Sequence, residues 1–363
     1  MTIGALRSQT VAQAMAHTRN SFTAIRLALA LAVVISHAFS VTTGQVTEEP
    51  LARSTGFTLG EHAVNGFFAI SGFLVAMSFD RRGWRDYVVA RGLRIAPGLA
   101  AATLAVGFLL GAVMTRLPLD DYLESSGLWR FVIATLTSFK SNTALPGVFE
   151  TNAFRFPMGT VWTLKYEVLC YAAVFVVGLL GLVRSKAFAL MLALGLALGV
   201  AGLELLRPDA SKSLETAFRL PLIFAVGGAL YVWRQDVRLS PVVVALIGVA
   251  AWLAAGSFLY EAVLFAGSAY AILWLAFAPA LVRLVPEPAA DLSYGTYLYG
   301  WPVQQALHAL FPTAAAALLL GPALLVTLGV AALSWFLVEK PALALKARTL
   351  GRGVIKSVNP AAT

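Results

Sequence analysis

One arginine and one histidine share a long apolar run near the amino terminus. Arg26 and His37 are eleven positions apart within residues 22–43, so on a helix they lie about 20° from eclipsed and about 16 Å apart along the axis. An ionisable side chain inside a bilayer is costly unless it is paired or lines a polar site. Histidine accepts and returns a proton near neutral pH. His37 is therefore a candidate catalytic base; the alternative is a histidine that makes only an interhelical hydrogen bond.

A carboxylate is expected at a depth similar to that of His37. Glu167 lies several residues inside the apolar run 160–183, and counting from the span ends places it level with the histidine. A neighbouring carboxylate would fix the imidazole tautomer. Pairing with Lys165 is the alternative, but residues two positions apart face different sides of a helix. We therefore expect Glu167 to contact His37 or another span.

An arginine cluster follows the second apolar run, in the stretch DRRGWRDYVVARGLRIAP. Its members are Arg81, Arg82, Arg85, Arg91 and Arg94. Planar guanidinium groups bind phosphate in a bidentate manner, so a phosphate-bearing ligand is one interpretation. Such clusters also set membrane topology or meet anionic lipid head groups, and that alternative stays open.

Other polar or small residues in the apolar runs have both structural and functional interpretations. Arg219, inside 214–233, either binds an acidic or hydroxylic substrate or extends outward to the membrane surface. Ser71 and Gly72, in AVNGFFAISGF, favour close helix packing. The aromatic residues of SYGTYLYGWP, which include Trp301, are typical of a membrane interface beside a proline kink.

The elements that must position these residues are membrane-spanning helices. The chain has 363 residues, 59% of them hydrophobic and only 12% charged, whereas soluble domains carry about 25% charged residues. Because a spanning helix needs about 20 apolar residues, we predict an all-α, polytopic helical bundle. The ten expected spans are 22–43, 62–80, 91–115, 160–183, 187–206, 214–233, 240–256, 259–284, 291–311 and 314–338. Nine or eleven spans remain alternatives, because 240–256 is short.

The basic residues predict an orientation and a domain plan. Most of the 27 Lys and Arg residues fall in segments that lie on one side when both termini are cytoplasmic, as the positive-inside rule requires. The net charge of +9 is thereby explained by contact with membrane lipid, and nucleic-acid binding is not expected. We predict a cytoplasmic segment 1–20, a membrane domain 21–345 and a basic cytoplasmic tail 346–363.

Two further expectations concern the outer segment and metals. Within 116–159 the stretch LWRFVIATLTSF predicts an amphipathic helix at the interface, capping the external face. A single cysteine excludes a disulfide within the chain and a cysteine-based metal site. We expect no bound metal.

The order of several motifs resembles the membrane-bound acyltransferase family 3. Members of this family typically carry an arginine and a histidine in the first span with the spacing of Arg26 and His37. The segments VNGFFAISGF, RGLRIAP, VWTLKYEVLCY, LSYGTYLYGWPV and VEKP match further family motifs in order, and the likeness covers about residues 20–345. Asn65 and Thr163 depart from common family residues, and LYGWP lacks a histidine that some members carry.

The resemblance implies transfer of an acyl group, most often acetyl, from cytosolic acyl-coenzyme A to a hydroxyl of a carbohydrate or lipid-linked glycan at the outer face. It implies a bacterial inner-membrane enzyme without a permanently bound cofactor, whose co-substrate is acyl-coenzyme A. His37 would be the base or transient acyl carrier, oriented by Glu167. The residues assigned to the coenzyme A phosphates are Arg26, Arg81, Arg82, Arg91 and Arg94. Those assigned to substrate binding are Arg219, Trp162 and Ser71.

A transporter is the competing class. It would also place polar residues inside a membrane bundle, but it would show paired broken helices in its two halves, and no such pair is evident in the sequence. A protein that only carries the acyl group across the bilayer for a separate transferase remains an alternative.

Overall fold

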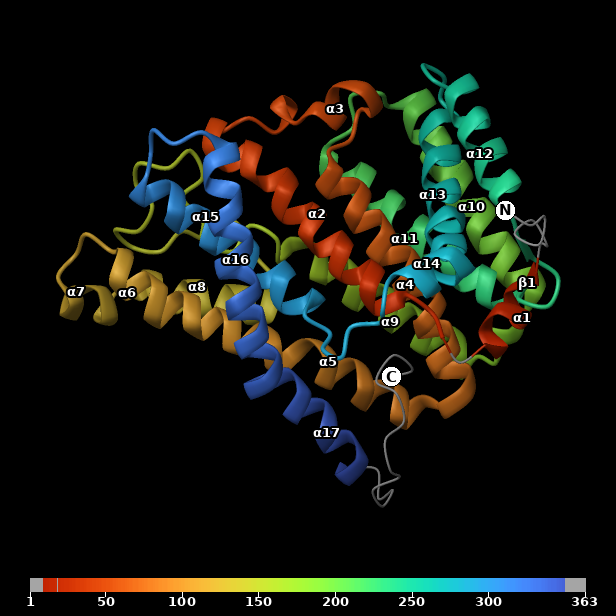
Figure 1. Ribbon diagram of the computed structural model, residues 1–363, viewed down its shortest axis with the longest axis horizontal. Coiled ribbons are helices and arrows are strands. Elements are labelled where there is room, and N and C mark those ends of the chain that lie inside the picture. The colour runs from red at the N-terminus through yellow and green to blue at the C-terminus, as the bar shows by residue number, and fades with distance from the viewer. Residues whose placement is uncertain (1–8, 18, 350–363) are drawn as a thin grey trace.

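The computed structural model describes residues 9–17 and 19–349 and is almost entirely helical (Figure 1). Its long helices are α2 (Phe22–Thr43), α4 (Leu59–Arg82), α5 (Trp84–Leu104), α9 (Trp162–Leu179), α10 (Lys186–Leu206), α11 (Lys212–Val232), α12 (Pro241–Leu253), α13 (Tyr260–Phe277), α15 (Ser293–Leu310) and α16 (Ala316–Ser334). Its short helices are α1 (Val11–Ala16), α3 (Pro50–Thr55), α6 (Gly111–Met114), α7 (Leu119–Glu124), α8 (Ser126–Ser138), α14 (Pro279–Leu284) and α17 (Lys340–Thr349). Two-residue strands, β1 (Gln9–Thr10) and β2 (Arg238–Leu239), pair antiparallel and attach the amino-terminal segment to the α11–α12 connection.

Each of the ten predicted spans contains a helix, and the span 259–284 is divided into α13 and α14. Within residues 9–17 and 19–349, eight helices are long and apolar enough to cross a membrane. The two that fall short are α12, which has 13 residues, and α15, which carries polar side chains along its length. The all-α, polytopic membrane fold is thus confirmed, and the protein is an integral membrane protein.

Two long helices each contain a π-helical turn, and the second of them continues past its expected end at residue 338. A π-helical turn, Ala105–Leu110, joins α5 to α6, and a second, Trp335–Glu339, joins α16 to α17. Helix α17 passes the predicted domain boundary at residue 345 and ends at Thr349. The rest of the predicted tail, residues 350–363, lies outside the described residues, as do residues 1–8 of the predicted amino-terminal segment.

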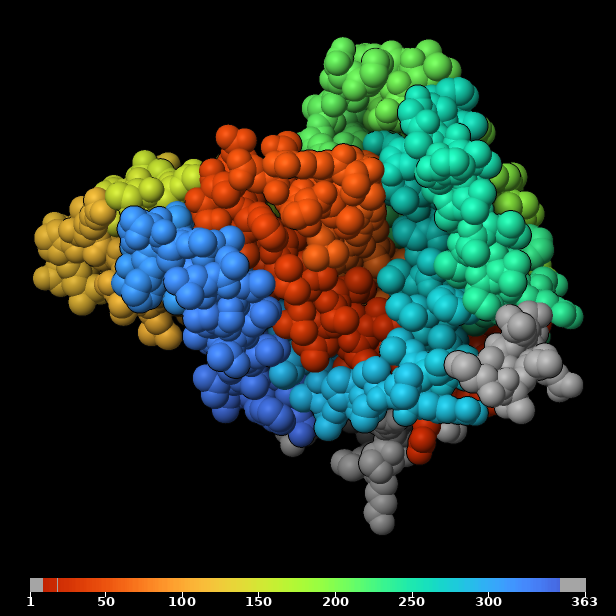
Figure 2. All heavy atoms as spheres, turned by 45° about the horizontal axis from the view of Figure 1, so that its top comes forward, coloured from red at the N-terminus to blue at the C-terminus, as the bar shows by residue number. Residues whose placement is uncertain are grey.

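Helices α2 and α4 form the centre of the bundle. Helix α2 packs against α4 on one side and against α15 and α16 on the other, while α4 also packs against α11 and α13. Figure 2 shows the red and orange surface of α2 and α4 between the blue α15–α16 side and the teal α12–α13 side. Side chains from α4, α9, α11 and α13 make one apolar core, and α5, α8 and α15 contribute to a second. Arg26 and His37 therefore lie on a helix with neighbours on several sides.

The close approach of α4 and α11 depends on two glycines. A Cβ at Gly72 would lie 2.0 Å from the carbonyl oxygen of Phe224, and one at Gly227 would lie 2.2 Å from that of Ala69. Both obstacles are backbone atoms, which cannot move aside without separating the helices. The close packing predicted from AVNGFFAISGF is confirmed at Gly72.

Replacing Gly227 by alanine is expected to lower the free energy of unfolding by about 1–3 kcal/mol, because the added methyl group forces apart a packed helix pair. The neighbouring Gly228 is the matched control. A Cβ at Gly228 would lie 3.6 Å from the nearest atom, the carbonyl oxygen of Gly72, so Gly228→Ala should unfold at the wild-type temperature or slightly above it. Thermal unfolding of the two purified variants in the same detergent compares them; equal stability would contradict the argument.

The segment 116–159 begins with the helices α7 and α8, and its later part lines a cavity. Helix α8 packs against α5 and the π-helical turn that follows it, and its Leu128 and Phe131 belong to the second apolar core. The chain after α8 then turns back, and Ser141, Phe154 and Phe156 line a cavity beside His37. The predicted helix is present, and its position at a membrane interface stays a prediction.

Candidate functional site

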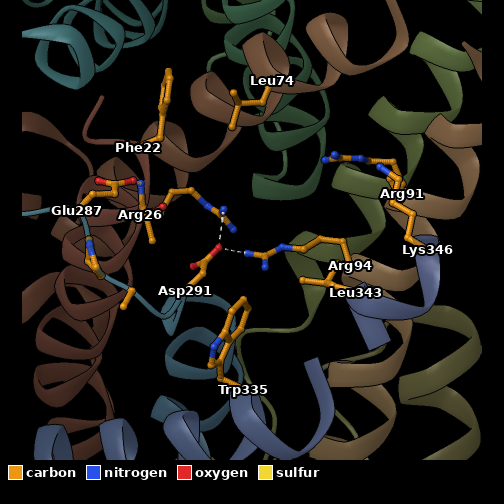
Figure 3. Close-up of a pocket in the computed structure, with 14 residues that line it drawn as sticks. Phe22, Arg26, Leu74, Arg91, Arg94, Glu287, Asp291, Trp335, Leu343 and Lys346 are labelled. Atoms are coloured by element: carbon orange, nitrogen blue, oxygen red, sulfur yellow. Dashed lines mark hydrogen bonds and ion pairs between the residues drawn. The ribbon is translucent and has the colours of Figure 1, made fainter. Parts of the chain in front are cut away.

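A basic pocket opens at the amino-terminal end of α2 (Figure 3). Arg26 Nη1 lies 2.8 Å from Asp291 Oδ2, and Arg94 Nη2 lies 3.0 Å from the same oxygen. Helices α2 and α5 thus each supply one arginine, and the loop before α15 supplies the shared carboxylate. One negative charge between two positive charges leaves this group electropositive.

Two more cations line the basic pocket. Arg91, one turn before Arg94, lies with its guanidinium 5.6 Å from the centre of the Tyr171 ring. Lys346 of α17 forms a 2.8 Å ion pair with Asp86 at the start of α5. Figure 3 shows Arg91 and Lys346 near each other, across the pocket from Arg26.

Not all of the predicted phosphate ligands gather here. Arg26, Arg91 and Arg94 line the basic pocket, whereas Arg81 and Arg82 do not. Those two residues lie at the end of α4, before α5 begins, and the Arg81 side chain is exposed. The sequence groups Arg81 and Arg82 with Arg91 and Arg94 in one segment, and this proximity could not distinguish one face of α5 from the end of α4.

A middle cavity of about 60 Å³ lies deeper in the bundle and shares Arg26 and Arg94 with the basic pocket. Ser71 of α4 and Glu167 of α9 both line it, and the Ser71 hydroxyl donates a hydrogen bond to Glu167 Oε1 at 3.4 Å. The hydroxyl of Tyr171 donates a hydrogen bond to the same oxygen. A polar lining at this depth is costly unless the cavity holds something polar.

The predicted contact between Glu167 and His37 is absent. Glu167 accepts hydrogen bonds from Ser71 and Tyr171. The buried Nδ1 of His37 has no hydrogen-bond partner among the described residues. The two side chains line different cavities. Counting residues from the span ends predicts only how deep each side chain lies in the membrane. The two side chains point in different directions from their helices, and this keeps them apart.

His37 lines a third and larger space, the histidine cavity, of about 300 Å³. The His37 ring meets the Trp301 ring edge to face, with centroids 5.0 Å apart. Trp301 in turn stacks on Phe156 at 5.4 Å and donates from its indole nitrogen to the Phe156 carbonyl oxygen. Trp162 lines the same cavity. Trp301 was predicted to lie at a membrane interface, but it is buried and positions the His37 ring.

A charged pair forms the polar wall of the histidine cavity. Arg219 Nη1 lies 3.4 Å from Glu61 Oε1, and both residues line the cavity. The Arg219 side chain is only 1% exposed, and its guanidinium lies against the rings of Phe57 and Phe265, which contact each other edge to face. Outward extension, one of the two predicted alternatives, is therefore excluded.

The three spaces follow one another through the bundle. The basic pocket and middle cavity share Arg26 and Arg94, and the middle and histidine cavities share Val64, Thr163 and Tyr297. The three spaces, together called the path, thus lie one after another between Arg26 and His37 of α2. Among the described residues no group of His, Cys, Asp or Glu is arranged to hold a metal ion.

Sequence reasoning missed four contributors to this path, namely Asp291, Glu61, Tyr171 and the Trp301–Phe156 stack. Asp291 carried one usable signal, since it is an acidic residue at the start of a predicted span. The remaining contributors had no signal in the sequence, because the way the helices and loops pack in the fold decides which of their residues face the path.

The chain is similar to known acyltransferases. The sequence model described as an acyltransferase domain matches residues 19–338. An O-acetyl transferase of Shigella phage Sf6 is 27% identical over 340 residues, which cover 89% of this chain and 96% of that protein. No solved structure matches the chain. The matched region contains every span of the bundle together with the arginine-to-histidine path, and the chain therefore belongs to the membrane-bound acyltransferase family 3.

Proposed function

We propose that this acyltransferase moves an acetyl group from acetyl-coenzyme A to a hydroxyl group of a carbohydrate. The observation that carries the proposal is the series of three cavities that leads from a cluster of cations to a histidine in an aromatic chamber. The name of the phage relative, an O-acetyl transferase, supports a hydroxyl acceptor and an acetyl group.

The basic pocket suits the phosphates of the donor. Coenzyme A carries several negative charges, and Arg26, Arg91, Arg94 and Lys346 converge on one pocket. The distance from Arg26 to His37, about 16 Å along the helix axis, is comparable with the length of a pantetheine arm. The arm would cross the middle cavity, where Ser71 and Glu167 can bond its amide groups.

His37 is proposed to act as the general base. It takes the proton from the acceptor hydroxyl as that oxygen attacks the thioester carbonyl carbon, and the carbon–sulfur bond then breaks. The proton on His37 passes to the departing thiolate, which leaves as the thiol of coenzyme A. Direct transfer requires only one acyl-transfer step, whereas an acyl-histidine intermediate requires two. Glu167 is assigned to the donor path rather than to orientation of the imidazole.

The histidine cavity suits one sugar unit. Its aromatic wall, from Trp301, Phe156 and Trp162, offers flat apolar faces to the C–H face of a pyranose ring. Glu61 of the polar wall and Ser36, which also lines the cavity, offer oxygen atoms that accept hydrogen bonds from sugar hydroxyls. We further propose that the Arg26 end faces the cytoplasm of a bacterial inner membrane, as the positive-inside rule predicts, and that the acceptor glycan reaches His37 from the outer side.

Replacing Arg26 by alanine is expected to weaken coenzyme A binding about ten- to a hundredfold, because a charge-assisted hydrogen bond contributes about 1.5–3 kcal/mol. The matched control is Arg81→Ala, since Arg81 is exposed and does not line the basic pocket. Calorimetric titration of coenzyme A into each purified variant measures the effect. Equal affinity in both variants would remove Arg26 from the donor site.

The proposal as a whole is tested in proteoliposomes that contain this protein alone. Acetyl-coenzyme A with a labelled acetyl group is supplied together with a glycan acceptor, and the label on the glycan is measured. Labelled glycan is expected. A protein that only carries the acyl group for another enzyme would produce none, and that result would refute the proposed transferase activity.

A further inference from the structure

The junction between the basic pocket and the middle cavity is closed by a charged bridge. Arg26 and Arg94 are the two residues that line both spaces. Asp291 Oδ2 accepts hydrogen bonds from both, at 2.8 and 3.0 Å, so one carboxylate ties the two arginines together (Figure 3). A molecule that reaches from the basic pocket into the middle cavity must pass between these side chains.

Asp291 is held in place independently of the arginines. Its other oxygen, Oδ1, accepts from the Ser293 hydroxyl at 2.5 Å and from the Ser293 backbone N–H at 3.3 Å, at the start of α15. Loss of the arginines would therefore leave Asp291 attached to α15. The arginine contacts use one oxygen only, which makes that half of the carboxylate the part that another anion can replace.

The loop before α15 brings a second carboxylate to the same pocket. Glu287 accepts hydrogen bonds from the backbone N–H groups of Thr23 and Ala24, at 2.8 and 3.5 Å, at the start of α2. In Figure 2 the light-blue segment between α13 and α15 crosses below the red surface of the first helices. An acidic loop thus places two carboxylates in a pocket whose other charged residues are all cations.

We propose that Asp291 is a gate residue that stands in for a donor phosphate. This inference rests on the proposed acyl-coenzyme A donor. Before the donor binds, Asp291 pairs with Arg26 and Arg94 and closes the junction. A diphosphate carries more charge and more acceptor oxygens than one carboxylate, so it replaces Asp291 as the partner of both arginines. The arginines then separate, and the pantetheine arm enters the middle cavity.

The opposite role makes the opposite prediction. If Asp291 merely held the arginines ready for phosphate, removing its charge would disorder them and weaken binding of the donor. If Asp291 competes with phosphate, only the open fraction of the molecules can bind the donor, and the apparent affinity is reduced in proportion to that fraction. Removing the charge of Asp291 then raises the apparent affinity. The sign of the change in affinity therefore separates a gate from a scaffold.

The first measurement is the affinity of purified full-length Asp291→Asn for coenzyme A, by calorimetric titration. The substitution keeps the shape of the side chain and removes its charge, and we expect roughly tenfold tighter binding, equivalent to about 1.4 kcal/mol. The matched control is Glu287→Gln, which removes one charge from the same pocket without a contact to either arginine, and its change should be clearly smaller. Weaker binding by Asp291→Asn, or an equal gain in both variants, overturns the gate.

The second measurement does not require coenzyme A. Ser71→Cys in a Cys170→Ala background places one thiol in the middle cavity, since Cys170 is the only native cysteine. A charged, water-soluble thiol reagent should label it slowly when Asp291 is intact and several-fold faster when Asp291→Asn is added. Equal labelling rates overturn the gate. If wild-type protein binds no coenzyme A, the proposed donor is wrong, and the labelling rates alone decide whether Asp291 closes the junction.

Discussion

Replacing His37 by alanine should reduce acyl transfer by a factor of about 10² to 10⁴, the usual contribution of a general base. Coenzyme A binding should be preserved, because the basic pocket lies at the other end of the path from His37. Turnover is measured as labelled acetyl on the acceptor, with saturating donor, and donor affinity is measured on the same preparation. A large fall in turnover at constant donor affinity is the result that identifies a residue of the chemical step.

A second buried histidine provides the matched control for this experiment. His308 on α15 is also buried, and its Nδ1 also lacks a hydrogen-bond partner among the described residues. It lines none of the three cavities. His308→Gln should therefore transfer acetyl at the wild-type rate. Turnover by His37→Ala within tenfold of that control would remove His37 from the mechanism.

Helix positions were largely predictable because each span must hide its backbone in the bilayer with apolar side chains. The run 22–43 became α2 with the same bounds. The start of α5 was placed too late, at residue 91 rather than Trp84, because its arginines lower the local hydropathy. Two of those arginines are stabilised inside the bundle, Arg94 by Asp291 and Arg91 by the Tyr171 ring. A prediction from hydropathy alone does not include partners of this kind.

The candidate site was predictable along one helix and unpredictable between helices. Helical periodicity sufficed to place Arg26 and His37 on one path, since both belong to α2. The predicted partner of His37, Glu167, was wrong. The ring of Trp301 on α15 contacts His37, and Glu167 accepts a hydrogen bond from Ser71 instead. Contacts between helices depend on their rotation and order in the bundle, which depth in the membrane leaves undetermined.

Replacing Arg219 by methionine is expected to destabilise the protein by about 3 kcal/mol. The side chain is 1% exposed and lies 3.4 Å from Glu61 and 3.8 Å from Glu215. Removing one partner of a buried ion pair leaves the other charge without compensation, which typically costs about 3–5 kcal/mol. We expect the lower end because Lys212, 3.5 Å from Glu61 and 3.2 Å from Glu215, still faces both carboxylates. Thermal unfolding in detergent measures the loss.

Two further variants decide whether Arg219 acts on the fold or on the acceptor. Lys212→Met removes a cation from the same cluster, but that side chain is 64% exposed, so the loss should stay below about 1 kcal/mol. The double variant Arg219→Met with Glu61→Gln should recover part of the lost stability, because the second substitution removes the carboxylate that has lost Arg219 as its partner. If Arg219→Met instead unfolds like the wild type while the KM for the acceptor rises, Arg219 is a ligand of the substrate. The Arg219 guanidinium already lies against two carboxylates and the rings of Phe57 and Phe265, and these contacts favour the structural outcome.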